Sequence, residues 1–238
     1  MSKPFAVFDI DGTLFRSSLI VEFVDEAIDS GIFPKSASQG YQVQYSAWKQ
    51  RATHDAYEDY INAVVATFLE NIKGKEEGEV AHIGKRLVNR THRETYVYTR
   101  ELLQQLRKTH FIIAISGSNV EFLEPFVKNY GFDLWHGSEL EVVDGKYTGH
   151  DASTGHHNKD LTLRNIIAKY ELQYNGSIAV GDTAPDIPML EMAQTAIAFN
   201  PSYNLFNHAK MIGWKIVVER KNTIYQLEKE DDKYILIE

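Results

Sequence analysis

The sequence of 238 residues contains no cysteine. Disulfide bonds, thiol nucleophiles and cysteine-based zinc sites are therefore excluded. Basic residues are also scarce relative to acidic ones, because 25 lysines and arginines face 33 aspartates and glutamates, for a formal net charge of −8. This balance disfavours broad binding to nucleic acid or to an anionic membrane, although a metal ion can reverse the field locally for a phosphate ligand.

Long apolar runs are missing as well. The first one, residues 5–10, is interrupted by Asp9 and followed by Asp11, so it resembles neither a signal peptide nor a membrane span. We therefore predict a cytoplasmic protein with no nucleic-acid or membrane partner. The oligomeric state, monomer or homodimer, stays open.

Short apolar runs alternate with helical patterns along much of the chain. The runs predicted as buried strands are residues 5–10, 111–115, 177–180, 195–199 and 215–218. Helical patterns occupy residues 95–108, 119–130, 159–170 and 185–193. This alternation predicts an α/β fold with a doubly wound, mainly parallel sheet.

Residues 16–94 break the alternation, since they carry only helical signals. We predict that this stretch forms a helical cap that determines substrate specificity. Residues 1–15 and 95–238 would then form the α/β catalytic core. For residues 142–147 we predict a hairpin with an Asp-Gly turn. For the charged tail, residues 221–238, three interpretations stay open: an edge strand, a packing tail or a partner contact.

Three polar clusters follow directly on predicted strands. They are Asp9-Ile-Asp-Gly-Thr13, Ser116-Gly-Ser118 and Gly181-Asp-Thr-Ala-Pro-Asp186. In an open α/β sheet, ligands bind at the carboxyl ends of the strands. We therefore expect the clusters to meet at one edge of the sheet, with Lys159 between the second and the third.

Such a site would gather the carboxylates of Asp9, Asp11, Asp182 and Asp186. Two like charges about 4 Å apart repel by roughly 4 kcal/mol at an effective dielectric constant of 20, so the cluster needs a cation. Oxygen ligands select a hard ion, and Mg²⁺ is the usual one beside phosphates.

Phosphate oxygens would also find partners at this edge. Ser116, Lys159 and the backbone amides around Gly12 and Gly117 are suitable donors. The carboxylates could then attack phosphorus and move protons.

The motifs resemble those of the haloacid-dehalogenase-like phosphohydrolases. Phe8-Asp-Ile-Asp-Gly-Thr-Leu14 is similar to the first motif of that family, Ile115-Ser-Gly117 to the second, Lys159 to the third, and Gly181-Asp182 with Asp186 to the fourth. The position of the helical insertion is similar to the cap of the phosphoserine-phosphatase-like branch.

The resemblance implies a role for each matching residue. Asp9 would be the nucleophile, and Asp11 would protonate the leaving alcohol and then activate water. Mg²⁺ would be held by Asp9, the backbone carbonyl of Asp11, and Asp182, while Asp186 would act through a metal-bound water or orient Lys159. Ser116 and Lys159 would hold the phosphoryl oxygens, and Thr13 would support the loop.

The resemblance also implies phosphate chemistry, because family members that cleave carbon–halogen bonds lack a carboxylate at the position of Asp11. The substrate would be a small phosphorylated metabolite. Phosphoserine phosphatases usually carry Ser at the position of Gly12 and Glu at that of Ser18, and this chain departs from both. The choice of substrate between phosphoserine and other phosphorylated amino alcohols therefore stays open. Phosphotransfer to an acceptor and a phospho-acceptor signalling or binding protein are the alternative functions.

Two arginines and three histidines complete the candidates. Arg16 and Arg51 are the cations of the helical insertion that could meet substrate charge. His150, His156 and His157 lie in a stretch rich in Ser, Thr, Gly and Asn, which we interpret as a polar loop rather than a metal site.

Overall fold

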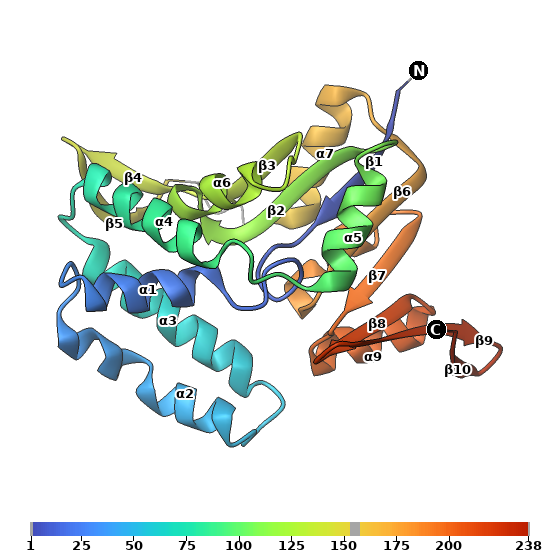
Figure 1. The fold of residues 1–238 in the computed structure, drawn as a ribbon, viewed down its shortest axis with the longest axis horizontal. Coiled ribbons are helices and arrows are strands. Elements are labelled where there is room, and N and C mark those ends of the chain that lie inside the picture. The colour runs from blue at the N-terminus through green and yellow to red at the C-terminus, as the bar shows by residue number, and fades with distance from the viewer. Residues whose placement is uncertain (1, 153–157, 238) are drawn as a thin grey trace.

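The computed structural model describes residues 2–152 and 158–237. Its centre is an eight-stranded sheet with the order β10-β9-β8-β7-β6-β1-β2-β3 (Figure 1). The strands are β1 Pro4–Phe8, β2 Phe111–Asn119, β3 Leu134–Ser138, β6 Gln173–Gly181, β7 Thr195–Phe199, β8 Lys215–Arg220, β9 Thr223–Glu230 and β10 Lys233–Leu236. All neighbours from β3 to β8 are parallel, and β9 and β10 are antiparallel.

Helices cover both faces of this sheet. Because side chains alternate along a strand, Phe5 and Val7 of β1 pack toward α7 (Lys159–Tyr170), α8 (Ile187–Leu190) and α9 (Tyr203–Ile212). Phe8 packs on the opposite face, toward α5 (Val97–Leu106) and α6 (Val120–Lys128). The predicted doubly wound α/β fold is confirmed.

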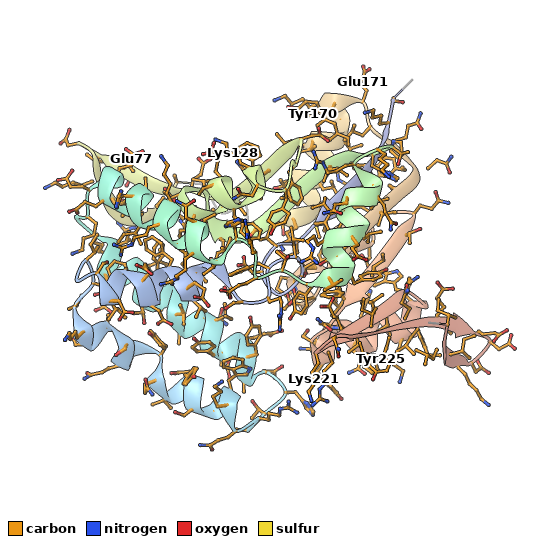
Figure 2. The ribbon with its side chains drawn as sticks, in the orientation of Figure 1. Glu77, Lys128, Tyr170, Glu171, Lys221 and Tyr225 are labelled. Carbon is orange, nitrogen blue, oxygen red and sulfur yellow. The ribbon has the colours of Figure 1, made fainter. Side chains whose placement is uncertain are left out.

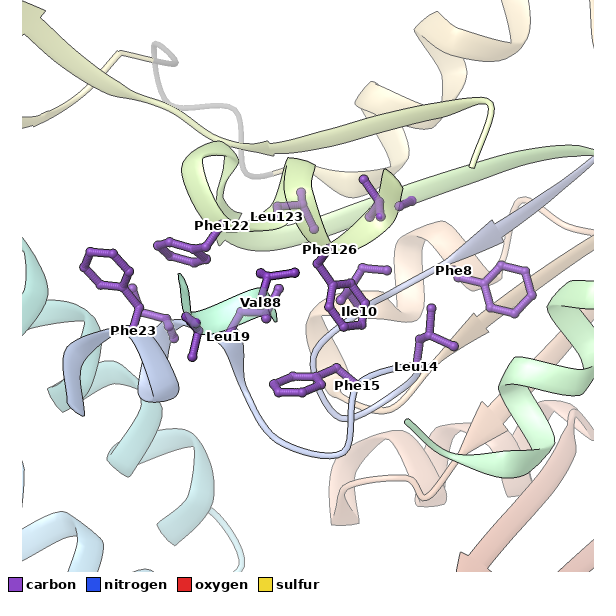
Figure 3. Close-up of a cluster of buried hydrophobic side chains, with 14 of the residues drawn as sticks. Phe8, Ile10, Leu14, Phe15, Leu19, Phe23, Val88, Phe122, Leu123 and Phe126 are labelled. Atoms are coloured by element: carbon purple, nitrogen blue, oxygen red, sulfur yellow. The ribbon is translucent and has the colours of Figure 1, made fainter. Parts of the chain in front are cut away.

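The loop after β1 is anchored in the larger hydrophobic core (Figure 3). Ile10, Leu14 and Phe15 are fully buried, and Phe15 meets Phe126 of α6 edge-on, with ring centroids 5.4 Å apart. Burying a side chain of this size contributes about 1.5–3 kcal/mol. The apolar residues of the loop therefore fix the backbone that carries Asp9 and Asp11.

The region between β1 and α5 is helical, as predicted. It contains α1 (Leu19–Asp29), a 3₁₀ turn (Lys35–Gly40), α2 (Gln42–Lys49), α3 (Ala56–Ile72) and α4 (Glu77–Thr91). Helix α4 packs directly on α6, where a Cβ at Gly84 would lie 2.7 Å from the carbonyl oxygen of Glu121. The last helix of the region is thus joined to the core.

The predicted hairpin is present as β4 (Leu140–Val143) and β5 (Lys146–Asp151). Both residues of its turn, Asp144 and Gly145, have positive φ angles, as the type I′ turn requires. In the tail, β9 and β10 extend the main sheet, so of the three alternatives the edge strand is the one found.

The helix predicted over residues 185–193 is shorter. A 3₁₀ turn (Ala184–Asp186) precedes the four residues of α8. Pro188, at the start of α8, has no N–H that could continue one helix from this turn. Strand β3 and helix α9 were not predicted.

Charged residues from several elements reach the surface, and Glu77, Lys128, Glu171 and Lys221, labelled in Figure 2, are exposed. Within residues 2–152 and 158–237, no helix has the length and apolar character needed to cross a membrane. His156 and His157 of the predicted polar loop lie outside the described residues.

Candidate active site

The candidate site lies where β1, β2 and β6 end. The backbone N–H of Asp9 continues the sheet by donating to the carbonyl of Val180, 2.9 Å away. Gly12 then takes a left-handed conformation, with φ of 76°, and a Cβ there would collide with the Asp182 carboxylate. The Gly12 N–H donates to the carbonyls of Phe15 and Ser17, so in this structure Gly12 supplies the turn rather than a free phosphate-binding amide.

Lys159 joins two of the carboxylates. From the first turn of α7, its Nζ donates to Asp9 Oδ1 at 2.6 Å and to Asp186 Oδ1 at 2.5 Å. All three side chains are largely buried, and Asp186 is fully so. Hydrogen bonds between ions in a dry site are strong, so Lys159 is held against the carboxylate of Asp9.

Asp11 faces away from this group. Its Oδ2 accepts from the hydroxyls of Ser116 and Ser118, each at 2.8 Å, and its Oδ1 accepts from the backbone N–H of Leu19 at 2.5 Å. Three donors from β2 and from the start of α1 therefore fix this carboxylate. Ser118 belongs to the second polar cluster, but its contact with Asp11 was not predicted.

Asp9, Asp182 and Asp186 form a buried group that suits a metal ion. Their ligand oxygens lie within 4.8 Å of one another. Thr13 Oγ1 donates to Asp182 Oδ1 at 3.3 Å, which supports that carboxylate from the first loop. Because the three donors are carboxylate oxygens, the group fits a hard cation such as Mg²⁺.

Asp186 is the most constrained member. Besides Lys159, it accepts from the backbone N–H groups of Asp182 and Thr183, at 3.1 and 3.0 Å, and from the Thr183 hydroxyl at 3.2 Å. Both oxygens of Asp186 are thus engaged by the protein. Thr183 is a contributor that the sequence analysis did not single out.

The electrostatics of the site follow from burial and crowding. Burial raises the pKa of Asp9 to about 8, although the Lys159 ammonium opposes the shift. Burial also raises the pKa of Asp11 and, together with the Asp9 and Asp186 charges, that of Asp182. Burial acts to lower the pKa of Lys159, but the carboxylates of Asp186 and Asp9 outweigh it, so the pKa rises. A further cation bound beside these carboxylates would lower their pKa values and favour the ionised forms at neutral pH.

A cavity of about 500 Å³ opens over the site. Asp9, Asp11, Ser116, Gly117 and Lys159 line its floor. One face of α3 forms another wall, at the helical spacing that places side chains together. The residues of that wall are Tyr57, Glu58, Ile61, Asn62, Val65, Phe68 and Leu69.

A second cavity, of about 430 Å³, adjoins the other side of Asp182. Arg16 lines this cavity, with its guanidinium 5.8 Å from the ring centroid of Tyr96. Tyr57 lines both cavities. Arg51 lines neither of the two and is exposed after α2, so the structure does not bring it to the candidate site.

Comparison with known proteins agrees with the geometry. Residues 6–191 match the family of haloacid dehalogenase-like hydrolases. Phosphoserine phosphatase SerB2 of Mycobacterium tuberculosis is 26% identical over 202 residues, which cover 84% of this chain and 44% of that protein. The chain thus spans less than half the length of this relative.

Solved structures have the same fold. A protein of unknown function from Bordetella pertussis Tohama I has a TM-score of 0.73 at 20% identity, covering 91% of this chain and 98% of that one. A phospho-aspartyl intermediate analogue of phosphoserine phosphatase has a TM-score of 0.61 at 21% identity, covering 93% and 96%. The chain belongs to the haloacid dehalogenase-like hydrolases, in their phosphoserine-phosphatase-like branch.

Proposed function

We propose that this protein is a Mg²⁺-dependent phosphatase that hydrolyses small phosphomonoesters through an aspartyl-phosphate on Asp9. One observation carries the proposal: Asp9, paired with Lys159 at 2.6 Å, and Asp11, held by three donors, line the same cavity. That arrangement supplies a nucleophile and a separate acid–base group. The family and its phosphoserine phosphatase relatives support the reaction class.

In the first half of the proposed reaction, the Asp9 carboxylate attacks phosphorus. Lys159 holds the phosphoryl oxygens and offsets the negative charge that gathers there. The Ser116 hydroxyl, which donates to Asp11 in this structure, would turn to donate to a phosphoryl oxygen. Such preorganised donors provide most of the catalysis in phosphoryl transfer. Asp11 gives its proton to the departing alcohol oxygen.

In the second half, Asp11 takes a proton from water as the water attacks the phosphorus of the aspartyl-phosphate. Inorganic phosphate leaves, and Asp9 and Asp11 return to their starting states. Burial favours this double role, because it raises the pKa of Asp11 and lets the group hold a proton.

Mg²⁺ would be held by Asp9 and Asp182, with the backbone carbonyl of Asp11 as a further ligand. The bound ion would neutralise the crowded carboxylates and polarise the phosphoryl group. Asp186, whose two oxygens already accept hydrogen bonds, would orient Lys159 beside the ion. Thr13 would keep Asp182 in place, Gly12 would leave room for the Asp182 carboxylate, and the backbone amides around Gly117 would meet the phosphate.

We propose further that residues 16–94 act as the cap and that residues 1–15 and 95–238 form the catalytic core. Helix α3 supports this division, since its side chains line the same cavity as Asp9. Arg16, beside the second cavity, would meet charge near Asp182, whereas nothing in the structure favours such a role for Arg51.

The test is release of phosphate from 4-nitrophenyl phosphate with Mg²⁺. We expect turnover that excess chelator stops and that Asp9→Asn abolishes. Unchanged turnover in Asp9→Asn would refute the nucleophile. Adding alcohol acceptors and comparing free with transferred phosphate separates hydrolysis from phosphotransfer, and a stable phosphoprotein without ester turnover would indicate a signalling phospho-acceptor.

A further inference from the structure

The walls of the 500 Å³ cavity differ in character from its catalytic floor. Apolar side chains make up much of the rest of the lining: Ile20, Ile61, Val65, Phe68, Leu69 and Leu140. Val65 is 36% exposed although it faces this space on α3. An apolar wall beside a phosphate site fits the carbon skeleton of an alcohol rather than a second ionic group.

Positive charge is scarce in this lining. Among the described residues that line the cavity, Lys159 is the only lysine or arginine. Its ammonium is already paired with Asp9 and Asp186. His136 is the only histidine among these described lining residues. A carboxylate on the substrate would therefore lose its hydration without meeting a lysine or arginine that is not already paired, which is costly.

Negative charge continues beyond the catalytic group. Glu58 and Asp151 line the cavity in addition to Asp9, Asp11 and Asp182. Glu58 lies in the first turn of α3, and within the described part of the chain no hydrogen bond or ion pair engages its carboxylate. Burial and the neighbouring Asp55 and Asp59 raise the pKa of Glu58, so a cation beside it would relieve its destabilised charge.

We propose that the substrate is the phosphate ester of an amino alcohol that has an apolar body and no carboxylate, with its ammonium bound by Glu58. This assignment rests on the proposed phosphatase function and names the class of ester on which it acts. The phosphate binds at Asp9 and Lys159, the carbon skeleton lies against the apolar lining that includes Ile61, one turn from Glu58, and the ammonium meets Glu58 at the start of α3.

Three esters with six carbon atoms each test the assignment: hexyl phosphate, 6-aminohexyl phosphate and the 6-phosphate ester of 6-hydroxyhexanoate. The sixth carbon is a methyl group in the first ester, carries an ammonium in the second and belongs to a carboxylate in the third. We expect kcat/KM for the ammonium ester to exceed that for the carboxylate ester at least tenfold. A tenfold ratio corresponds to about 1.4 kcal/mol.

Glu58→Gln should lower the ratio of kcat/KM between the ammonium and methyl esters about tenfold, because it removes the charge and keeps the shape. Asp59→Asn is the matched control, since it removes an equal charge one residue away on α3 without lining the cavity. It should leave that ratio and the turnover of all three esters unchanged.

The outcomes separate the two proposals. Preference for the carboxylate ester, or equal shifts in Glu58→Gln and Asp59→Asn, would overturn the substrate assignment while 4-nitrophenyl phosphate is still hydrolysed through Asp9. Failure to hydrolyse 4-nitrophenyl phosphate in an Asp9-dependent manner would overturn the proposed function, and the assignment with it.

Discussion

Asp11 separates the two halves of the proposed reaction, because it serves as acid in one and as base in the other. In Asp11→Asn, hydrolysis of hexyl phosphate should fall about 10²–10⁴-fold, since an alkoxide leaves poorly without a proton. 4-Nitrophenolate needs no acid to leave, so the variant should still attack 4-nitrophenyl phosphate. Stopped-flow absorbance should show a burst of about one nitrophenolate per protein, followed by slow turnover.

The burst distinguishes this role from a structural one. If Asp11 only supported the loop through Ser116, Ser118 and Leu19, both esters would slow by the same factor and no burst would appear. Thermal unfolding of the variant provides the control for folding. A common loss of rate in a fully folded variant would contradict the acid–base assignment.

Gly181, the last residue of β6, tests how closely Asp186 must be held. A Cβ at Gly181 would lie 2.6 Å from Asp186 Cβ and 2.7 Å from its Cγ, so Gly181→Ala must displace the group that orients Lys159. We expect kcat for 4-nitrophenyl phosphate to fall about 10²-fold, the effect of a misplacement of roughly 1 Å.

Gly176→Ala, in the same strand, is the matched control. Its φ of 79° makes alanine cost about 1–2 kcal/mol of stability, but its nearest contact is Pro4 Cβ at 3.6 Å, far from the site. It should lose stability and keep kcat. Equal kcat in both variants would show that Asp186 tolerates displacement.

At the scale of single residues, the sequence predicts which polar residues meet at the edge of the sheet, but not the hydrogen bonds between them. Asp9 and Lys159 were expected to meet, because parallel strands bring their following loops to one edge of the sheet. The hydrogen bond from Ser118 to Asp11 depends on side-chain rotamers, which no spacing reveals. Glu58 could not be found either, since its place in the cavity depends on how α3 docks.

Among the elements, α4 and α6 meet closely enough to exclude a side chain at Gly84. A Cβ there would lie 2.7 Å from the Glu121 carbonyl oxygen and 3.3 Å from Phe122 Cα, and both atoms belong to backbone that cannot rotate away. Although alanine favours helix by about 1 kcal/mol over glycine, we expect Gly84→Ala to lower the free energy of unfolding by about 1–3 kcal/mol. Urea denaturation would measure the change.

Gly78, in the first turn of the same helix, has free space where Gly84 is tightly packed. A Cβ at Gly78 has nothing within 4 Å, so Gly78→Ala should stabilise the protein by up to about 1 kcal/mol. If both substitutions had the same sign, the close packing of α4 on α6 would not determine the position of this helix.

The sequence predicted elements best where burial is complete. Helices cover both faces of the sheet at its centre, so the strands there consist of short apolar runs. These strands are β1, β2, β6, β7 and β8. Strand β3, with the sequence Leu-Trp-His-Gly-Ser, lies at the edge and is only partly buried, so it has no such run. The tail stayed undecided for the same reason, since β9 and β10 mix charged and apolar residues at the opposite edge.

For the whole molecule, burying several carboxylates in one site links stability to pH and to metal. In the metal-free protein the pKa of Asp9 is raised to about 8, and those of Asp11 and Asp182 are raised as well. An unfolded aspartate titrates near pH 3.9. Between about pH 4 and pH 8 the folded state therefore binds more protons than the unfolded state, and the contribution of this cluster to stability falls as pH rises.

Mg²⁺ should reverse this loss, because it binds the ionised carboxylates and competes with the protons. In thermal unfolding scans, we expect the gain in Tm on replacing excess chelator with Mg²⁺ to be clearly larger at pH 8 than at pH 5. Asp182→Asn removes one carboxylate from the group and should reduce both the pH dependence in chelator and the gain from Mg²⁺. An equal gain at the two pH values, or an unchanged gain in Asp182→Asn, would mean that the ion stabilises the protein somewhere other than this cluster.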